Sequence, residues 1–244
     1  MRLRFILAYD GTLFSGWQSQ AHGKTVQDAL ESSLKLLCAE SITVYGSGRT
    51  DAGVHALGQS AHADVPDDRF PLRGWLPALN ARLPEGVRVM SVKRVAPDFH
   101  ARFSARSKIY RYTVWNAAVM PPLYLNRAWH VTGKLDLDLL KTVCESFVGS
   151  HDFAAFSARR LQPGRSSIRT VSAIRTSRQG RKLTLTFEGE GFLYKMVRML
   201  AASAIRCAGG RLDIGEIERR LNGTAPRSTY VAPAGGLCLM RVVY

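Results

Sequence analysis

One order of strands and helices occurs twice in this sequence, and this repetition restricts the fold more than any other feature. The first half reads as strand, helix, two strands, helix and strand, at residues 2–9, 25–37, 41–47, 58–65, 71–83 and 87–95. Thr25 heads the first helix, and Asp28, three residues later, completes a capping pair. These patterns predict the order β-α-β-β-α-β.

The second half repeats this order with one added helix. Its elements lie at residues 108–116, 136–149, 171–189 (a hairpin), 194–210, 213–223 (the addition) and 236–244. Within the hairpin, Leu183, Leu185 and Phe187 alternate with polar residues. We therefore expect an α+β protein of two tandem ferredoxin-like halves, residues 1–104 and 105–244, each with helices on one side of an antiparallel sheet.

Basic residues exceed acidic ones mainly in the second half. Residues 1–104 hold 12 Lys and Arg against 10 Asp and Glu, whereas residues 105–244 hold 22 against 9. Arginine predominates in two acid-free stretches, one of which contains Arg165 and Arg169. A solvated face that only keeps the protein soluble is one interpretation. We favour a surface for RNA phosphates, because the planar guanidinium suits phosphate and aromatic residues interleave with the basic ones.

Several classes of protein lack their usual signs in this chain. The apolar run near the start is too short for a signal peptide or a membrane span. Four widely separated cysteines are typical of reduced thiols in a cytoplasmic protein, and the six histidines form no metal-ligand motif. The glycine stretches fit neither nucleotide-binding motif. We therefore expect no metal and no organic cofactor.

Residues 46–59, GSGRTDAGVHALGQ, form a glycine-rich segment that presents Arg49 and Asp51. An aspartate in such a turn often only accepts hydrogen bonds from backbone amides. The alternative is chemical: a neighbouring arginine holds the carboxylate ionised, and an ionised, positioned carboxylate can act as a covalent nucleophile. Taken alone, the segment favours a turn-stabilising aspartate over a nucleophile, so the choice depends on evidence from the rest of the chain.

The chain resembles the tRNA pseudouridine synthase A family in segments that extend along its whole length. These segments are YDGTLFSGWQSQ (9–20), TVQDALE (25–31), GSGRTDAGVHALGQ (46–59), FHARFSARSKIYRY (99–112), HDFAAF (151–156), GFLYKMVRML (191–200) and GLCL (236–239). The segment GRTDAGVHA alone is nearly diagnostic. The resemblance implies the pseudouridine synthase fold, with two halves around a central basic cleft.

The resemblance also implies roles for individual residues. Asp51 matches the nucleophile, which attacks either ribose C1′ or uracil C6, and Arg49 matches the arginine that helps to extrude the base. Tyr110 matches the active-site tyrosine that stacks on the flipped base, with Tyr112, of the same strand parity, as the fallback. Arg198 matches the arginine that pairs with the aspartate, although its position alone suits an exposed helical arginine.

Further residues of the matched segments remain open. Leu239 is expected either to line the substrate pocket or to be an ordinary core leucine. Gln18, His55 and Phe99 have no assigned role beyond shaping the cleft, and Arg165 and Arg169 are expected to contact tRNA phosphates.

The resemblance implies isomerisation of uridine to pseudouridine at positions 38, 39 and 40 of the tRNA anticodon stem-loop. It further implies a homodimer in which one tRNA spans both subunits. Two other functions compete with this hypothesis: a catalytically silent RNA-binding protein of the same fold, and a metal-dependent phosphotransferase that uses Asp51 as a ligand. The latter needs more carboxylates nearby, and none follows Asp51 before Asp64.

Overall fold

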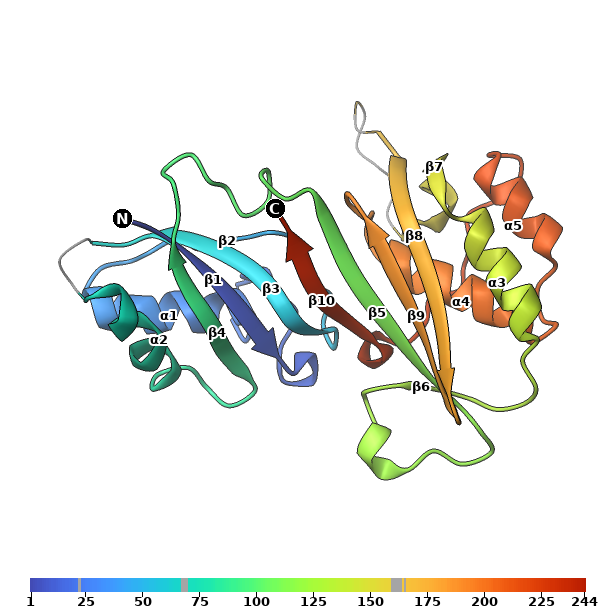
Figure 1. The fold of residues 1–244 in the computed structure, drawn as a ribbon, viewed down its shortest axis with the longest axis horizontal. Helices are drawn as coiled ribbons and strands as arrows, with labels where there is room; N and C mark the ends of the chain where they lie inside the picture. Colours follow the sequence, from blue (N-terminus) through green and yellow to red (C-terminus); the bar gives the residue numbers. More distant parts are fainter. Residues whose placement is uncertain (22, 67–69, 159–163, 165) are drawn as a thin grey trace. The chain divides into compact units, whose positions relative to one another are not determined.

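The computed structural model describes residues 1–21, 23–66, 70–158, 164 and 166–244, and it divides the chain into two compact units. Unit 1 comprises Met1–Arg106 and Cys238–Tyr244, and unit 2 comprises Ser107–Leu237. Both units contain helices and strands, which Figure 1 labels, so the predicted α+β class is confirmed.

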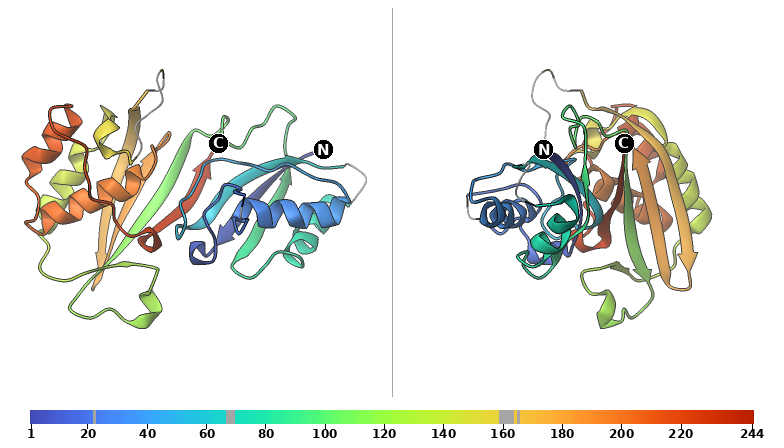
Figure 2. Two further views of the ribbon diagram at one scale, coloured as in Figure 1. Left: turned by 180° about the vertical axis from the view of Figure 1, so that it is seen from behind. Right: turned by 60° about the vertical axis from the view of Figure 1, so that its left-hand side comes forward.

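Unit 1 contains the first β-α-β-β-α-β series in the predicted order. Its elements are β1 (Arg2–Tyr9), the 3-10 turn η1 (Gly11–Leu13), α1 (Val26–Cys38), β2 (Tyr45–Gly46), β3 (His55–Asp64), α2 (Leu72–Asn80) and β4 (Val87–Arg94). The strand β1 pairs antiparallel with β3 on one side and β4 on the other, and the short β2 pairs with β3. Both helices lie against one face of this sheet (Figures 1 and 2).

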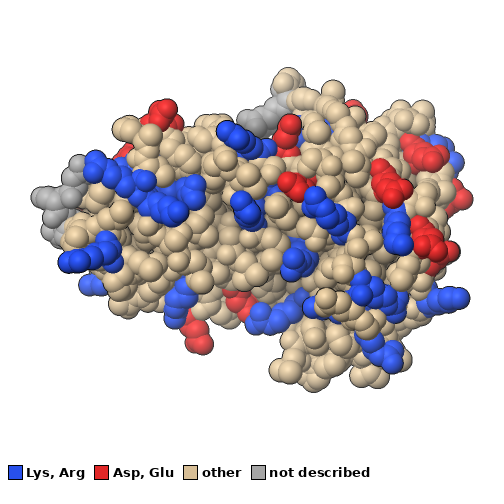
Figure 3. All heavy atoms as spheres, in the orientation of Figure 1, with Lys and Arg blue, Asp and Glu red and all other residues tan. Residues whose placement is uncertain are grey.

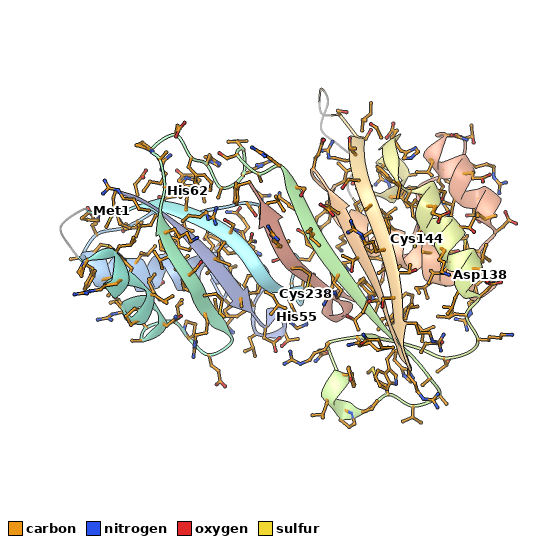
Figure 4. All side chains as sticks on the ribbon, viewed as in Figure 1. Met1, His55, His62, Asp138, Cys144 and Cys238 are labelled. Carbon is orange, nitrogen blue, oxygen red and sulfur yellow. The ribbon has the colours of Figure 1, made fainter. Side chains whose placement is uncertain are left out.

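The last strand, β10 (Leu237–Val243), lies in unit 1 from its second residue, whereas its pattern placed it with the second half. It pairs parallel with β3, so that Cys238 lies opposite His55 (Figure 4). Gly58 permits this pairing, because an added Cβ would lie 2.4 Å from the carbonyl oxygen of Met240. The chain end thus completes the sheet of unit 1 through a contact between residues far apart in sequence.

Unit 2 holds the remaining elements. They are β5 (Ser107–Asn116), η2 (Pro122–Tyr124), β6 (Trp129–Val131), α3 (Leu137–Ser146), β7 (Gly149–Asp152), η3 (Ala154–Phe156), β8 (Ile168–Gln179), β9 (Lys182–Gly189), α4 (Met196–Ala208), α5 (Ile214–Leu221) and η4 (Ala234–Gly236). The sheet runs β5-β9-β8-β7 with antiparallel pairs, and β6 pairs parallel with β5. The helices α3 and α4 pack on one face of this sheet, and α5 packs on α3 (Figure 2).

Burial follows the predicted periodicities. Leu183, Leu185 and Phe187 of β9 are buried and the residues between them are half-buried, which confirms the alternation. In α4, every residue except Arg198 and Arg206 is buried. This helix is therefore apolar around most of its surface, and its two arginines stand out as polar groups within a core element.

Candidate active site

The loop between β2 and β3 carries Arg49 and Asp51. Gly11 and Gly16, from an earlier segment, allow the backbone of that segment to pack closely against the loop. Gly16 has φ +96°, and an added Cβ there would lie 2.7 Å from the carbonyl oxygen of Thr50. An added Cβ on Gly11 would lie 2.1 Å from the carbonyl oxygen of Val54. No side chain fits at either position without displacing the loop, so two of the segments of the family resemblance form one packed structure.

Backbone hydrogen bonds hold this contact. The amide of Trp17 donates to the carbonyl of Thr50 at 3.1 Å, and the amide of Gly53 donates to the carbonyl of Gly11 at 3.1 Å. The turn itself closes when the amide of Val54 donates to the carbonyl of Asp51 at 3.1 Å. Because this bond uses the main chain of residue 51, any residue there can make it.

Buried polar side chains form hydrogen bonds with the loop from the protein interior. The fully buried Gln59 accepts a hydrogen bond from the hydroxyl of Ser47 at 2.9 Å and donates to the carbonyl of Gly48 at 2.9 Å. The hydroxyls of Tyr9 and Thr50 lie 2.9 Å apart. Sequence reasoning did not single out Gln59. The available signal was its place in a strand whose neighbouring residues are small or apolar, where a buried amide needs partners.

Asp51 is half-buried, whereas Arg49 is exposed. Arg49 donates from Nε to the side-chain oxygen of Gln18 at 3.1 Å. The Nδ1 atom of His55 lies 3.2 Å from the amide nitrogen of Gly11 and 3.2 Å from the carboxylate of Asp10. Gln18 and His55, which the sequence left without a role, thus both contact the segments that form this loop.

Phe99 and Leu239 also lie in unit 1. The ring of Phe99 packs 4.9 Å from that of Tyr244 and 6.0 Å from that of His62, in an aromatic cluster at the other end of β3 (Figure 4). Leu239 is fully buried in β10 opposite Ala56 of β3. This complete burial is typical of a core leucine, which is one of the two alternatives expected for Leu239.

The two candidate tyrosines lie on β5 in unit 2, and both are buried. Tyr112 is fully buried, and its hydroxyl donates to the carbonyl of Pro233 at 2.8 Å. Burial raises the pKa of Tyr112 far above its usual value, while the charge of Arg198 opposes this shift. Tyr110 packs edge-to-face on Phe192, with ring centroids 5.4 Å apart. Tyr112 is therefore a core residue, and Tyr110 remains the candidate.

Arg198 is half-buried in α4 rather than exposed on a polar face. Its Nε donates to the carbonyl of Ala232 at 2.8 Å, and the amide of Ala232 donates back to the carbonyl of Arg198 at 3.2 Å. These two bonds join α4 to the segment before β10. The hydrogen bond to Ala232 thus fixes the orientation of the Arg198 side chain, whereas an arginine on a solvated helix face has no such fixed orientation.

The expected phosphate contacts are described in part. Arg165 lies outside the described residues. Arg169, at the start of β8, is half-buried and donates to the carbonyl of Ser166 at 3.0 Å. The structure places Arg49, Asp51 and Leu239 in unit 1, and Tyr110, Arg198 and Arg169 in unit 2.

A metal-binding cluster and a membrane-spanning helix are both absent from the residues that the structure describes. Among these residues no three His, Cys, Asp or Glu side chains are grouped closely enough to hold a metal ion. No helix in the same residues has the length and hydropathy to cross a bilayer. Burial raises the pKa of Cys144 to about 12 and that of Cys207 to about 11, so both are unreactive thiols at neutral pH.

Sequence comparisons connect this geometry to known proteins. A family model described as tRNA pseudouridine synthase matches residues 6–104 and 143–244. A protein from Akkermansia muciniphila named tRNA pseudouridine synthase A is 44% identical over 251 residues, covering 100% of this chain and 95% of that protein. Proteins of the same name from Solidesulfovibrio magneticus and Geobacter sp. (strain M21) are 44% and 39% identical, covering 91% and 98% of those proteins and 100% and 99% of this chain. The matched ranges contain Arg49, Asp51, Arg198 and Leu239, and Tyr110 lies between them.

Proposed function

Because the chain belongs to the tRNA pseudouridine synthase family, which isomerises uridine to pseudouridine in tRNA, we propose that Asp51 is the nucleophile of this reaction. The observation that supports this role is the main chain of the loop. The carbonyls of Thr50 and Asp51 already accept hydrogen bonds from Trp17 and Val54, so the turn is closed without the carboxylate of Asp51. The closure of the turn thus does not depend on the side chain at position 51, which supports a role for the carboxylate in the reaction.

The reaction needs a carboxylate and no external reagent. Attack of Asp51 on ribose C1′ breaks the bond from C1′ to N1, whose electron pair leaves on N1. Attack on uracil C6 instead adds the carboxylate across the C5–C6 double bond, and the bond from C1′ to N1 then breaks with its electron pair on N1. The uracil then turns, C5 bonds to C1′, and Asp51 is released. C5 loses its proton and N1 gains one, so the product has the atoms of the substrate. Nothing is oxidised or reduced, and no cofactor is required.

Other residues prepare the uridine for this attack. A stacked uridine hides C1′ and C6 from side chains, so the base must first leave the RNA stack. Arg49 would occupy the space that the base leaves. Tyr110 would stack on the extruded base and Arg198 would pair with Asp51, while Leu239 would add an apolar wall to the pocket.

The proposed substrate is the tRNA anticodon stem-loop at positions 38, 39 and 40. Arg165 and Arg169 would bind phosphates of the tRNA, as their guanidinium groups suit. We further propose a homodimer that binds one tRNA across both subunits, acting in the cytoplasm, where tRNA is abundant and thiols stay reduced.

The substitution Asp51→Asn tests the nucleophile. The amide has almost the shape of the carboxylate but is no nucleophile at neutral pH, so product formation should be abolished while tRNA affinity and fold remain. Single-turnover release of tritium from C5 of uridine in folded, unmodified tRNA, with EDTA present, measures the rate. Asp64→Asn, the same change outside the loop, is the control and should retain wild-type activity.

Two results would contradict the proposal. If Asp51→Asn keeps more than a few per cent of the wild-type rate, the carboxylate is not the nucleophile. If the wild-type protein binds tRNA but releases no tritium until a metal ion is added, the metal-ligand role of Asp51 replaces the covalent one.

A further inference from the structure

Arg49 is held at one nitrogen, in a manner that leaves the rest of its guanidinium available to RNA. The side chain is exposed, and its Nε donates to Gln18 Oε1 at 3.1 Å. Within the described residues its two terminal nitrogens make no hydrogen bond. A guanidinium fixed in this way has a set direction and two donor groups free for a ligand.

Gln18 is itself held by a buried glutamine at the start of α1. Gln18 Nε2 donates to Gln27 Oε1 at 2.8 Å, and Gln27 is 8% exposed. Gln27 Nε2 donates to Glu31 Oε1 at 2.9 Å and to the carbonyl of Val44 at 3.2 Å. A continuous chain of side-chain hydrogen bonds therefore runs from Arg49 through two amides to Glu31.

The two ends of this chain determine the orientation of both amides. Arginine only donates hydrogen bonds, and an ionised carboxylate only accepts them. Each glutamine between Arg49 and Glu31 must therefore accept on the Arg49 side and donate on the Glu31 side. Reversing either amide would place two donors or two acceptors against each other, so the chain has one direction and its bonds strengthen one another.

The backbone around Gln27 is anchored independently of its side chain. The amide of Gln27 donates to the carbonyl of Trp17 at 3.1 Å, and the amide of Val26 donates to the carbonyl of Gly16 at 3.1 Å. The segment before Gln18 thus stays docked on the first turn of α1 when a side chain of the chain is changed. Substitutions at Gln18 consequently probe the orientation of Arg49 rather than the fold.

We propose that Gln18 and Gln27 are positioning residues that hold the guanidinium of Arg49 in the direction from which it enters the RNA stack. This inference rests on the extruding role proposed for Arg49. A free arginine side chain loses considerable rotational freedom when it inserts into RNA. Holding one rotamer before binding removes part of that loss, so the chain should speed extrusion without adding a contact to tRNA.

The test compares Gln18→Ala with a matched control, Gln20→Ala, whose exposed side chain donates to the carbonyl of Ser15. Gln18→Ala should lower the single-turnover rate about tenfold on a stacked, paired uridine and less than about twofold on an unpaired loop uridine. Its tRNA affinity should be unchanged. Gln18→Glu keeps the acceptor for Arg49 but places a carboxylate oxygen against Gln27 Oε1, so it should recover the rate only in part, and Gln20→Ala should behave as wild type.

A double-mutant cycle and an NMR measurement separate this inference from the role of Arg49 itself. Gln18→Ala should cause no further loss in the Arg49→Ala protein, and in free protein it should speed hydrogen exchange at Arg49 Nε. Additive losses, or unchanged exchange and rate in Gln18→Ala, would overturn the positioning role. If Arg49→Ala alone leaves both uridines at the wild-type rate while exchange responds to Gln18→Ala, the extruding role fails and the hydrogen-bond chain stands.

Discussion

Single residues in this protein show how packing contacts distinguish similar candidates. Tyr110 and Tyr112 have the same parity on β5, yet an added Cβ on Gly236 would lie 2.7 Å from the ring of Tyr112, which packs against the backbone before β10. The hydroxyl of Tyr112 satisfies the carbonyl of Pro233. Both observations give Tyr112 a packing role that its sequence position does not reveal, and they leave Tyr110 as the candidate for catalysis.

His62 is a buried residue whose titration should make unit 1 acid-sensitive. Its Nδ1 accepts a hydrogen bond from the amide of Ala101 at 3.1 Å. Burial, then the nearby His100 and Arg2, lower the pKa of His62 to about 4, against a small opposing effect of Asp64. Figure 4 shows His62 on β3.

The sign of this effect follows from proton binding. The unfolded chain takes up a proton near pH 6.5, its ordinary value, whereas the folded protein does so only near pH 4. The free energy of unfolding should therefore fall as pH drops from 6.5 to 4, by on the order of 2 kcal/mol from this group. Urea unfolding of His62→Asn should show a flatter dependence in this range than wild type. Equal slopes in both proteins would assign the acid sensitivity to other groups, and His151→Asn is the control.

At the scale of elements, α1 links stability to the site because its first turn carries Gln27. The helix begins in a capping box in which Thr25 Oγ1 accepts from the amide of Asp28 at 3.2 Å, and the Asp28 side chain accepts from the amide of Thr25 at 3.3 Å. The pair Thr25 and Asp28 predicted from sequence is thus confirmed.

Thr25→Ala should lower the free energy of unfolding by about 1 kcal/mol, because it leaves an amide of the first turn without its acceptor. The urea midpoint, with an unchanged slope, measures this loss. Ser32→Ala, an exposed position in the middle of the same helix, should be neutral or slightly stabilising because alanine is the better helix former. A Thr25→Ala protein as stable as wild type would mean that tertiary packing alone holds the start of α1.

At the scale of the whole molecule, the location of surface charge depends on two things. One is which half of the sequence holds the basic residues, and the other is which face of a strand their side chains occupy. The net charge is +15, of which residues 1–104 contribute 12 basic against 10 acidic residues. Yet Figure 3 shows many Lys and Arg side chains over the strands of unit 1. Leu3, Phe5 and Leu7 of β1 are buried, which turns Arg4 to the opposite face, beside Lys93 of β4. The small net charge of residues 1–104 therefore does not predict that each face of the sheet of unit 1 is neutral.

The affinity for tRNA should depend strongly on salt, because displacement of counterions from several phosphates makes binding weaker by orders of magnitude between low and moderate salt. Replacing Arg165 and Arg169 together by Ala should weaken binding of different tRNAs to a similar extent and reduce the slope of log affinity against log salt. Lys35→Ala, on the exposed side of α1, is the control and should leave the slope unchanged. Loss of affinity for one tRNA alone would indicate base reading rather than phosphate contact.

The sequence alone determined the α+β class, the order of elements in the first half, the capping pair of α1 and the family, whereas it missed β6 and β7 in the second half. Each of these correct predictions depends on residues close together in the chain: alternation at Leu183, Leu185 and Phe187, a capping pair three residues apart, and segments such as GRTDAGVHA. Such local patterns constrain the backbone before any distant contact forms, so they can be read without a structure.

The tertiary structure decided which distant residues meet. It placed β10 beside β3, gave Tyr112 a carbonyl partner 121 residues away, and joined Arg49 to Gln18 across 31 residues. Periodicity states which face of an element is apolar but not which segment covers it. A polar side chain likewise has no preferred partner until packing excludes water around it, and for this reason the orientation of Arg49 is a property of the folded protein.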